Sequence, residues 1–147
     1  MNSNLLFDEF EQLFWQLAKK TEYQWKVIYQ ETFPGSQSVI MYFLEQRGPL
    51  KMSTLADTLH LTAGAVTTAS NKLIERGFVS RTRDQQDRRV VRLEITDQGR
   101  TVMNELQETG RQMMKDTFHH VSDSDLQKMN RIFIQSIHQL NELEKKE

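Results

Sequence analysis

The chain has 147 residues, of which 37% are hydrophobic and 27% charged, and its formal net charge at pH 7 is −1. This length suits one globular domain that buries its own core, although the low aliphatic content leaves burial against a partner chain as an alternative. No cysteine is present, which excludes disulfides, thiolate metal sites and thiol-based redox sensing.

Membrane insertion and secretion are not expected. The longest apolar run, Val39–Leu44, is far shorter than the ~20 residues that a helix needs to span a bilayer. The first residues, Met1-Asn2-Ser3-Asn4, show no basic segment followed by an apolar stretch, so no signal peptide is expected. We therefore expect a cytoplasmic protein.

The charge is distributed unevenly along the chain. From Arg47 to Arg92 there are nine basic and four acidic residues, so this segment carries +5 and the remainder carries −6. Attraction to phosphate groups depends on local rather than total charge. The basic middle of the chain therefore favours an anion-binding centre between acidic flanks.

Two helices are predicted at the N-terminal end. Residues 5–30 carry apolar side chains at three- and four-residue steps, which indicates a long amphipathic helix. The segment Phe33-Pro34-Gly35-Ser36 breaks this helix, because proline fixes its own backbone and biases the residue before it away from the helical region. Ser36 is the candidate N-cap of a second helix, which is expected to run to about Arg47 and stop at Gly48-Pro49.

Two short helices joined by a tight turn are predicted next. The first spans about residues 51–59, Leu61-Thr62 turns the chain, and the second spans residues 63–76. Thr62 is the candidate N-cap of the second helix, and Gly77 lies where a left-handed residue would end it. This arrangement is typical of a helix-turn-helix motif.

A β-hairpin and two long helices complete the prediction. Residues 78–83 and 91–95 have strand composition and alternation, and their connection lacks glycine, so we expect an irregular loop rather than a two-residue turn. Residues 96–99 open a helix with a soft point at Gly110, and residues 122–125 cap the last helix. The predicted fold class is mainly α with a small β-hairpin wing, a winged helix-turn-helix flanked by long N- and C-terminal helices.

The outer face of the 63–76 helix is small and polar. A helical projection places Val66, Ala69 and Leu73 together on the inner side. Small residues let a helix lie deep in the major groove, threonine can meet base edges or phosphates, and asparagine can pair with adenine. The residues of this helix and its cap that we expect to bind DNA are Thr62, Gly64, Ala65, Thr67, Thr68, Asn71 and Lys72.

The hairpin loop supplies a second group of candidates. Arg88 and Arg89 at its tip are expected to enter the minor groove, whose negative potential favours arginine. Asp87 is expected to hold Arg83 or a neighbouring arginine in an ion pair that supports the wing. The alternative for both groups is an ordinary solvated surface.

Several stretches of the chain occur together in one known family. They are Leu55-Ala56, Leu61-Thr62 leading to Val66-Thr67, Leu73-Ile74-Glu75-Arg76-Gly77-Phe78-Val79, the loop Arg83-Asp84-Gln85-Gln86-Asp87-Arg88-Arg89, and Leu93-Glu94-Ile95-Thr96-Asp97-Gln98-Gly99. With these stretches, the segment from about Ser36 to Gly99 resembles the multiple antibiotic resistance regulator (MarR) family. The flanking helices agree in number and order, so the resemblance covers nearly the whole chain.

The resemblance implies a regulator of transcription. The expected organisation is one domain over residues 1–147, with a winged lobe at about 36–96 and dimerisation helices at about 5–30 and 97–145. Family members usually act as homodimeric repressors on pseudo-palindromic double-stranded DNA. Many release DNA when a small aromatic or lipophilic effector fills a pocket between the dimer helices and the DNA lobe. No cofactor is implied.

Other functions remain as alternatives. A winged helix can serve as a protein-interaction module without specific DNA binding, but such a surface needs apolar anchors, which Gly64, Thr68 and Asn71 do not supply. A helical dimer that buffers a ligand or metal would lack a DNA affinity that depends steeply on salt. No phosphate-binding glycine loop, nucleophile elbow, HExxH motif or cysteine nucleophile is present, so an enzyme is not expected.

Two sets of side chains have uncertain roles at this level. His119 and His120 could bind a metal with Asp116 or Asp123, but the chain has no cysteine ligand and no two histidines at i, i+4 on one face. Six of the aromatic residues of the first two helices suit an effector pocket, but we expect most of them in the core or a dimer interface. These residues are Trp15, Tyr23, Trp25, Tyr29, Tyr42 and Phe43.

Overall fold

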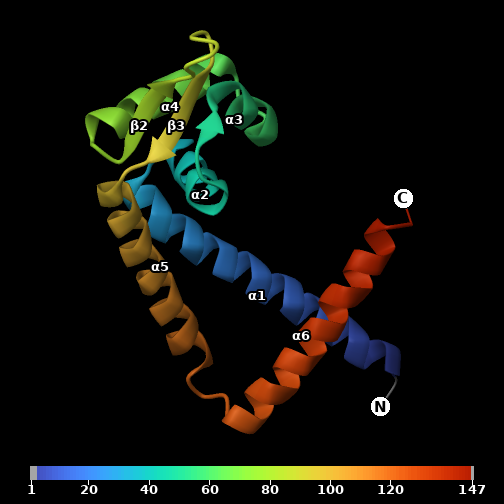
Figure 1. Ribbon diagram of the computed structural model, residues 1–147. Coiled ribbons are helices and arrows are strands. Elements are labelled where there is room, and N and C mark those ends of the chain that lie inside the picture. The colour runs from blue at the N-terminus through green and yellow to red at the C-terminus, as the bar shows by residue number, and fades with distance from the viewer. Residues whose placement is uncertain (1–2, 147) are drawn as a thin grey trace. The chain divides into compact units, whose positions relative to one another are not determined.

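The computed structural model describes residues 3–146 (Figure 1). Its elements are α1 (Ser3–Thr32), α2 (Gln37–Arg47), β1 (Leu50–Lys51), α3 (Met52–Leu59), α4 (Ala63–Glu75), β2 (Val79–Arg83), β3 (Val91–Ile95), α5 (Asp97–Phe118) and α6 (Asp123–Glu144). This order confirms the predicted winged helix-turn-helix fold with long flanking helices. Residues 1, 2 and 147 of the predicted domain lie outside the described residues, as does the start of the segment in which no signal peptide is expected.

The chain divides into two compact units, Met1–Gly110 and Arg111–Glu147. The first holds α1, the winged lobe and the first part of α5. The second holds the end of α5 and all of α6, whose predicted cap is confirmed because the Ser122 hydroxyl accepts a hydrogen bond from the Asp125 backbone N–H at 3.1 Å. Within the described residues, no helix combines the length and apolar character needed to cross a membrane.

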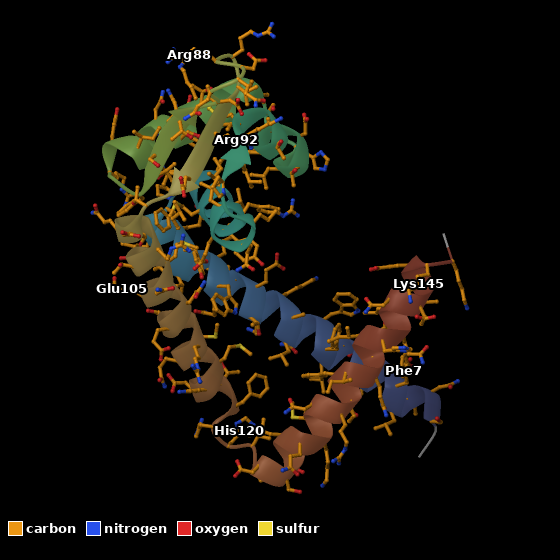
Figure 2. All side chains as sticks on the ribbon, in the orientation of Figure 1. Phe7, Arg88, Arg92, Glu105, His120 and Lys145 are labelled. Carbon is orange, nitrogen blue, oxygen red and sulfur yellow. The ribbon has the colours of Figure 1, made fainter. Side chains whose placement is uncertain are left out.

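Large apolar side chains are exposed along α1 and α6 of the single chain (Figure 2). On α1 they are Leu5, Leu6, Phe7, Phe10, Leu13, Phe14 and Trp15. On α6 they are Ile132, Phe133, Ile134, Ile137, Leu140 and Leu143. Neither helix contributes a fully buried residue within the chain. The periodic apolar pattern of both helices therefore exceeds what this chain buries by itself.

The sheet has three antiparallel strands in the order β1-β3-β2. β2 pairs with β3 from Val79↔Ile95 to Arg83↔Val91, which confirms the predicted hairpin. β1 adds Leu50↔Leu93 and Lys51↔Arg92 on the other side of β3. The sequence analysis missed β1, because a two-residue strand is too short to show alternation and its pairing depends on residues distant in the chain.

The ends of α4 are formed as predicted. The Thr62 hydroxyl accepts a hydrogen bond from the Ala65 backbone N–H at 3.1 Å and caps the helix. After the helix, Gly77 has φ +78°, a left-handed conformation that suits glycine. Both ends of this helix are therefore set by local chemistry.

The start of α2 differs from the prediction. Ser36 occupies the N-cap position as predicted, but it has helical backbone angles and its side chain makes no capping hydrogen bond, so the expected side-chain cap is wrong. The Gln30 amide holds this loop instead: its Oε1 accepts from the Gly35 N–H at 2.7 Å, and its Nε2 donates to the Ser38 hydroxyl at 2.9 Å. The last turn of α1 thus holds the loop that precedes α2, because α1 continues far enough to bring Gln30 beside it.

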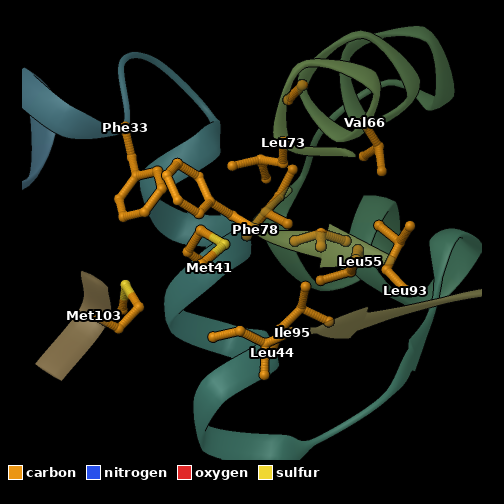
Figure 3. Packing of buried hydrophobic residues seen from close by; sticks show 13 residues of the cluster. Phe33, Met41, Leu44, Leu55, Val66, Leu73, Phe78, Leu93, Ile95 and Met103 are labelled. Atoms are coloured by element: carbon orange, nitrogen blue, oxygen red, sulfur yellow. The ribbon is translucent and has the colours of Figure 1, made fainter. Parts of the chain in front are cut away.

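The core of the first unit lies between the sheet, α2, α3, α4 and the beginning of α5 (Figure 3). The predicted inner face of α4 is confirmed, because Val66 and Leu73 are fully buried and Ala69 nearly so. Beside them the rings of Phe33 and Phe78 meet edge to face, with their centroids 5.5 Å apart. Sequestering these apolar groups from water is the main force that holds the lobe together.

Gly110 is a packing position as well as a helix residue. It is buried, and a Cβ built there would overlap the indole ring of Trp25 on α1. Helix α5 continues through Gly110 to Phe118. The residue interpreted from the sequence as a soft point therefore allows α1 and α5 to approach each other closely.

Ser70 also lies on the inner face of α4, where the sequence analysis did not place a polar group. Its hydroxyl is fully buried and, among the described residues, has no hydrogen-bond partner. Leaving a buried hydroxyl unpaired costs about 1–3 kcal/mol.

We expect Ser70→Ala to raise the free energy of unfolding by about 1 kcal/mol in urea denaturation, because it removes the unpaired hydroxyl and because alanine favours the helix.

The control for this variant is Thr68→Ala on the exposed face of the same helix, which should change stability by less than about 0.5 kcal/mol. A loss of stability in Ser70→Ala comparable to that of a core cavity would contradict the expectation.

Candidate nucleic-acid interface

The predicted DNA-binding residues of α4 lie along one outer face of the helix. Gly64, Thr67, Thr68, Asn71 and Lys72 are exposed, and Ala65 is half-buried. The Thr67 hydroxyl donates to the Ala63 carbonyl at 2.9 Å, which leaves its methyl group and oxygen lone pairs toward solvent. The face is small, polar and free of large apolar groups.

Asn71 has a partner that the sequence analysis missed. The Arg81 guanidinium, on β2, donates through Nη2 to the Asn71 Oδ1 at 2.6 Å. No sequence signal joins the two residues, because one lies on a helix and the other on a strand. The contact depends on how β2 packs against α4.

The loop between β2 and β3 projects beyond the helices of the lobe (Figure 1). The Asp84 carboxylate organises its first turn by accepting hydrogen bonds from the backbone N–H groups of Gln86 and Asp87 at 2.8 and 3.2 Å. Its other oxygen lies 3.7 Å from the guanidinium of Arg92. Asp84 was not singled out in the sequence, although an aspartate that binds backbone amides two and three residues ahead is a common turn device.

Two further contacts within the loop involve Asp87 and Arg83. Asp87 accepts from the Arg89 backbone N–H and from its guanidinium, at 3.1, 3.1 and 3.2 Å. Arg83 donates to the Arg88 carbonyl at 2.9 Å. The Arg88 side chain lies at the far end of the wing (Figure 2). Asp87 thus contacts a neighbouring arginine, while Arg83 contacts the loop backbone.

Two residues counted in the basic segment have structural contacts away from α4's outer face. Arg76 donates to the Thr32 carbonyl at 2.6 Å, and its guanidinium lies 4.8 Å from the centroid of the Phe78 ring. Arg47 lies over the ring of Phe43, 4.6 Å from its centroid. The charge of +5 therefore overstates the basic field that the lobe offers to a ligand.

Two hollows flank α4. One, of about 330 Å³, separates it from the loop at residues 34–37 and includes Thr68 and Lys72 in its lining. The other, of about 340 Å³, lies toward the wing and includes Lys51 and Arg89. The helix therefore stands between two depressions, each with at least one basic side chain.

The histidines form no evident metal centre. The His119 Nδ1 lies 2.8 Å from the Asp116 carbonyl, and the rings of His119 and His120 are 5.8 Å apart, edge to face. Among residues 3–146, no three histidine, aspartate or glutamate side chains are grouped so that they could hold a metal ion.

The hydrogen bonds of the loop lower the pKa of two carboxyl groups. The Gln86 and Asp87 backbone amides hold the pKa of Asp84 below its ordinary value, with a smaller effect from the positive charge of Arg92. The Arg89 side chain, and then its backbone amide, lower the pKa of Asp87. Each charged carboxylate is therefore favoured in the folded loop.

These shifts predict how the wing responds to acid. A lowered folded pKa stabilises the loop above the unfolded value, about 3.9 for aspartate, and this contribution is lost as pH falls through the lower folded value. We expect the backbone amide NMR signals of Gln86 and Asp87 to stay unchanged on acidification until the pH is below about 3.9. In the Asp84→Ala variant the Gln86 and Asp87 amide signals should be shifted already at neutral pH. A titration midpoint above the ordinary pKa of aspartate would contradict the lowered pKa of Asp84.

Comparison with known proteins agrees with this geometry. Residues 35–91 match the model of the MarR family. The HTH-type transcriptional regulator YpoP of Bacillus subtilis is 23% identical over 133 residues, which cover 90% of this chain and 94% of YpoP. The HTH-type transcriptional repressor MdtR of the same species is 33% identical over 64 residues, 44% of this chain and 41% of MdtR.

Solved structures share the fold. The YusO protein of Bacillus subtilis superimposes with a TM-score of 0.80 at 19% identity, over 94% of this chain and 99% of YusO. FabT of Streptococcus pneumoniae, solved in complex with DNA, gives a TM-score of 0.63 at 20% identity, over 91% of this chain and 99% of FabT. The winged lobe, residues 35–91, is thus matched by the MarR family model, and 90% of the chain aligns with a helix-turn-helix transcriptional regulator.

Proposed function

We propose that this chain is a sequence-specific DNA-binding repressor that acts as a homodimer on a pseudo-palindromic site. The observation that carries the proposal is the outer face of α4, which is exposed, narrow and polar and stands between two hollows lined partly by basic residues. An α-helix of this kind fits the major groove, and the hollows on either side would receive the two sugar-phosphate backbones.

Each candidate residue has a role in this proposal. Thr67, Thr68 and Asn71 meet base edges, while Lys72 neutralises a backbone phosphate. The small residues Gly64 and Ala65 allow the backbone of α4 to approach the DNA closely. The N-terminal end of α4, which Thr62 caps, favours a phosphate group. On the wing, Arg88 and Arg89 enter the minor groove, and Arg83 and Asp87 hold the loop in shape.

The exposed apolar faces of α1 and α6 support the dimer. Phe7 and Phe10 on α1 are 62% and 57% exposed, and Ile134 and Leu140 on α6 are 67% and 60% exposed. A single chain in water would leave these groups solvated at a substantial free-energy cost. We propose that a second copy of the chain covers both helices and so sets the spacing of the two α4 helices.

Relatives support repression and DNA binding as the mode of action. MdtR carries the name of a transcriptional repressor, and FabT was solved with DNA bound. A repressor that binds chromosomal DNA in a bacterium works in the cytoplasm, where we place this function. The alternative, a winged helix that binds only proteins, lacks support because α4 shows no apolar anchor on its outer face.

A groove between α1 and α2 supports an effector. It has a volume of about 360 Å³ and is lined by Trp25, Tyr29, Val39 and Tyr42, with Lys26 among the polar residues. Trp25 stacks on Tyr29 with their ring centroids 5.9 Å apart. Burial, and then the Glu45 carboxylate, raise the pKa of Tyr29. A small aromatic molecule fits this lining, in which Lys26 can pair with an acidic group of the ligand and Glu22 supplies an opposing negative charge.

Selection of bound sequences from a random duplex pool tests the DNA-binding proposal. The purified protein should enrich a palindrome whose half-site centres are about one helical turn, on the order of 34 Å, apart, because a dimer presents two α4 helices.

Asn71→Ala should weaken binding to this selected duplex by about 1–3 kcal/mol and relax the base preference at one step. Arg88→Ala with Arg89→Ala should weaken binding to all duplexes and reduce its dependence on salt.

A selected sequence with only one half-site would contradict binding as a dimer. No enrichment at all would favour the protein-interaction module. Equal losses by Asn71→Ala on the selected and random duplexes would remove Asn71 from base reading.

The effector groove is tested by fluorescence with salicylate, a phenolic carboxylate, as the probe. Trp15→Phe leaves Trp25 as the single tryptophan of the chain. We expect salicylate to quench its emission saturably and to weaken duplex binding, because the probe would lie against the indole ring. Tyr42→Ala should weaken this quenching several-fold. Tyr23→Ala, an exposed tyrosine outside the groove lining, is the control, and equal effects of the two variants would exclude the groove.

A further inference from the structure

We infer that Arg81 is a specificity-determining residue: it orients the amide of Asn71 so that this side chain presents a hydrogen-bond donor, and not an acceptor, to the DNA. The inference rests on the proposed DNA-binding function and deepens it. It concerns a residue of the strand, outside the helix and loop tip to which the sequence pattern pointed.

The orientation follows from the chemistry of the two side chains. A guanidinium group has only donors, so its partner on the Asn71 amide must be the carbonyl oxygen. The distance from the Arg81 Nη2 to the Asn71 Oδ1 is 2.6 Å, short as expected of a charge-assisted hydrogen bond. With its oxygen engaged, the amide has its Nδ2 group left for a ligand.

The strand explains how Arg81 reaches Asn71. Side chains two residues apart on a strand share a face, so Arg81 lies on the same face of β2 as Val79 and Arg83. Val79 is buried, with 2% exposure, and β2 packs against α4. Arg83, farther along, donates to the Arg88 carbonyl of the loop at 2.9 Å. One face of β2 thus contacts the base-reading helix through Arg81 and the wing tip through Arg83.

This orientation changes the base that Asn71 should prefer. Bidentate recognition of adenine needs the amide oxygen to accept from N6 while the amide nitrogen donates to N7. Guanine presents only acceptors on its major-groove purine edge, N7 and O6. An asparagine whose oxygen is held by Arg81 therefore suits guanine, which revises the adenine preference expected from the residue type alone.

A double-mutant cycle on the selected duplex tests the coupling. Arg81→Ala and Asn71→Ala should each weaken binding by about tenfold, the loss expected of one specific base contact. The double variant should bind about as well as the weaker single variant, because both substitutions remove the same interaction. Repeating the selection with Arg81→Ala should flatten or shift the preference at the base that Asn71→Ala relaxes.

Arg83→Ala is the matched control, since it removes an arginine from the same face of the same strand. Arg83→Ala should weaken binding while leaving the base preference at the Asn71 position intact. In the double variant, the fold-losses of affinity from Arg83→Ala and Asn71→Ala should multiply. The selected base should be guanine in the wild-type protein.

Three results would overturn the inference. One is multiplicative losses for Arg81→Ala and Asn71→Ala. Another is an adenine preference that survives Arg81→Ala. The third is a salt slope that falls by about 1 in Arg81→Ala with the base preference unchanged, since this would make Arg81 a phosphate contact. If the wild-type protein enriches no sequence, the proposed function falls as well, whereas any of the three results with a wild-type palindrome leaves that function standing.

Discussion

The burial of one face of α4 is the constraint on which the rest of the structure depends. Val66 and Leu73 are fully buried in the core, so the rotation of this helix about its axis is fixed. Its C-terminal end is held separately, because Arg76 donates to the Thr32 carbonyl at the end of α1. A helix fixed in both ways keeps its polar side turned outward, and Asn71 faces solvent as a consequence of what packs on the opposite side.

The wing shows how acidic residues can support a basic loop that we propose to bind DNA. Asp84 and Asp87 lower the net attraction of the loop for phosphate groups, yet they hold its backbone amides and the Arg89 guanidinium. A loop that is already ordered loses less conformational entropy when it binds. The acidic residues thus reduce the long-range attraction of the loop to phosphate groups, but they give the loop a defined conformation. Such a conformation matters most where a side chain must enter a narrow groove.

The sequence predicted the elements well because their signals are local. The capping threonine at Thr62, the left-handed Gly77 and the alternation of the hairpin strands each act within a few residues, and the structure confirms them. What the sequence did not reveal depends on contacts between distant segments. The Gln30 amide holds the loop before α2, and Arg81 reaches Asn71 from another element. Flexible side chains have many possible partners, and only the packed fold selects among them.

The close approach of Gly110 to Trp25 has a consequence for evolution. Any side chain at position 110 would overlap the indole ring while Trp25 keeps its place, so position 110 cannot acquire a side chain unless position 25 changes. In lineages where residue 110 acquires a side chain, residue 25 must become smaller or turn away, and a groove whose lining includes Trp25 would change shape with it. We therefore expect the two positions to covary, so that a substitution in α5 would reshape the groove on α1 that we propose for an effector.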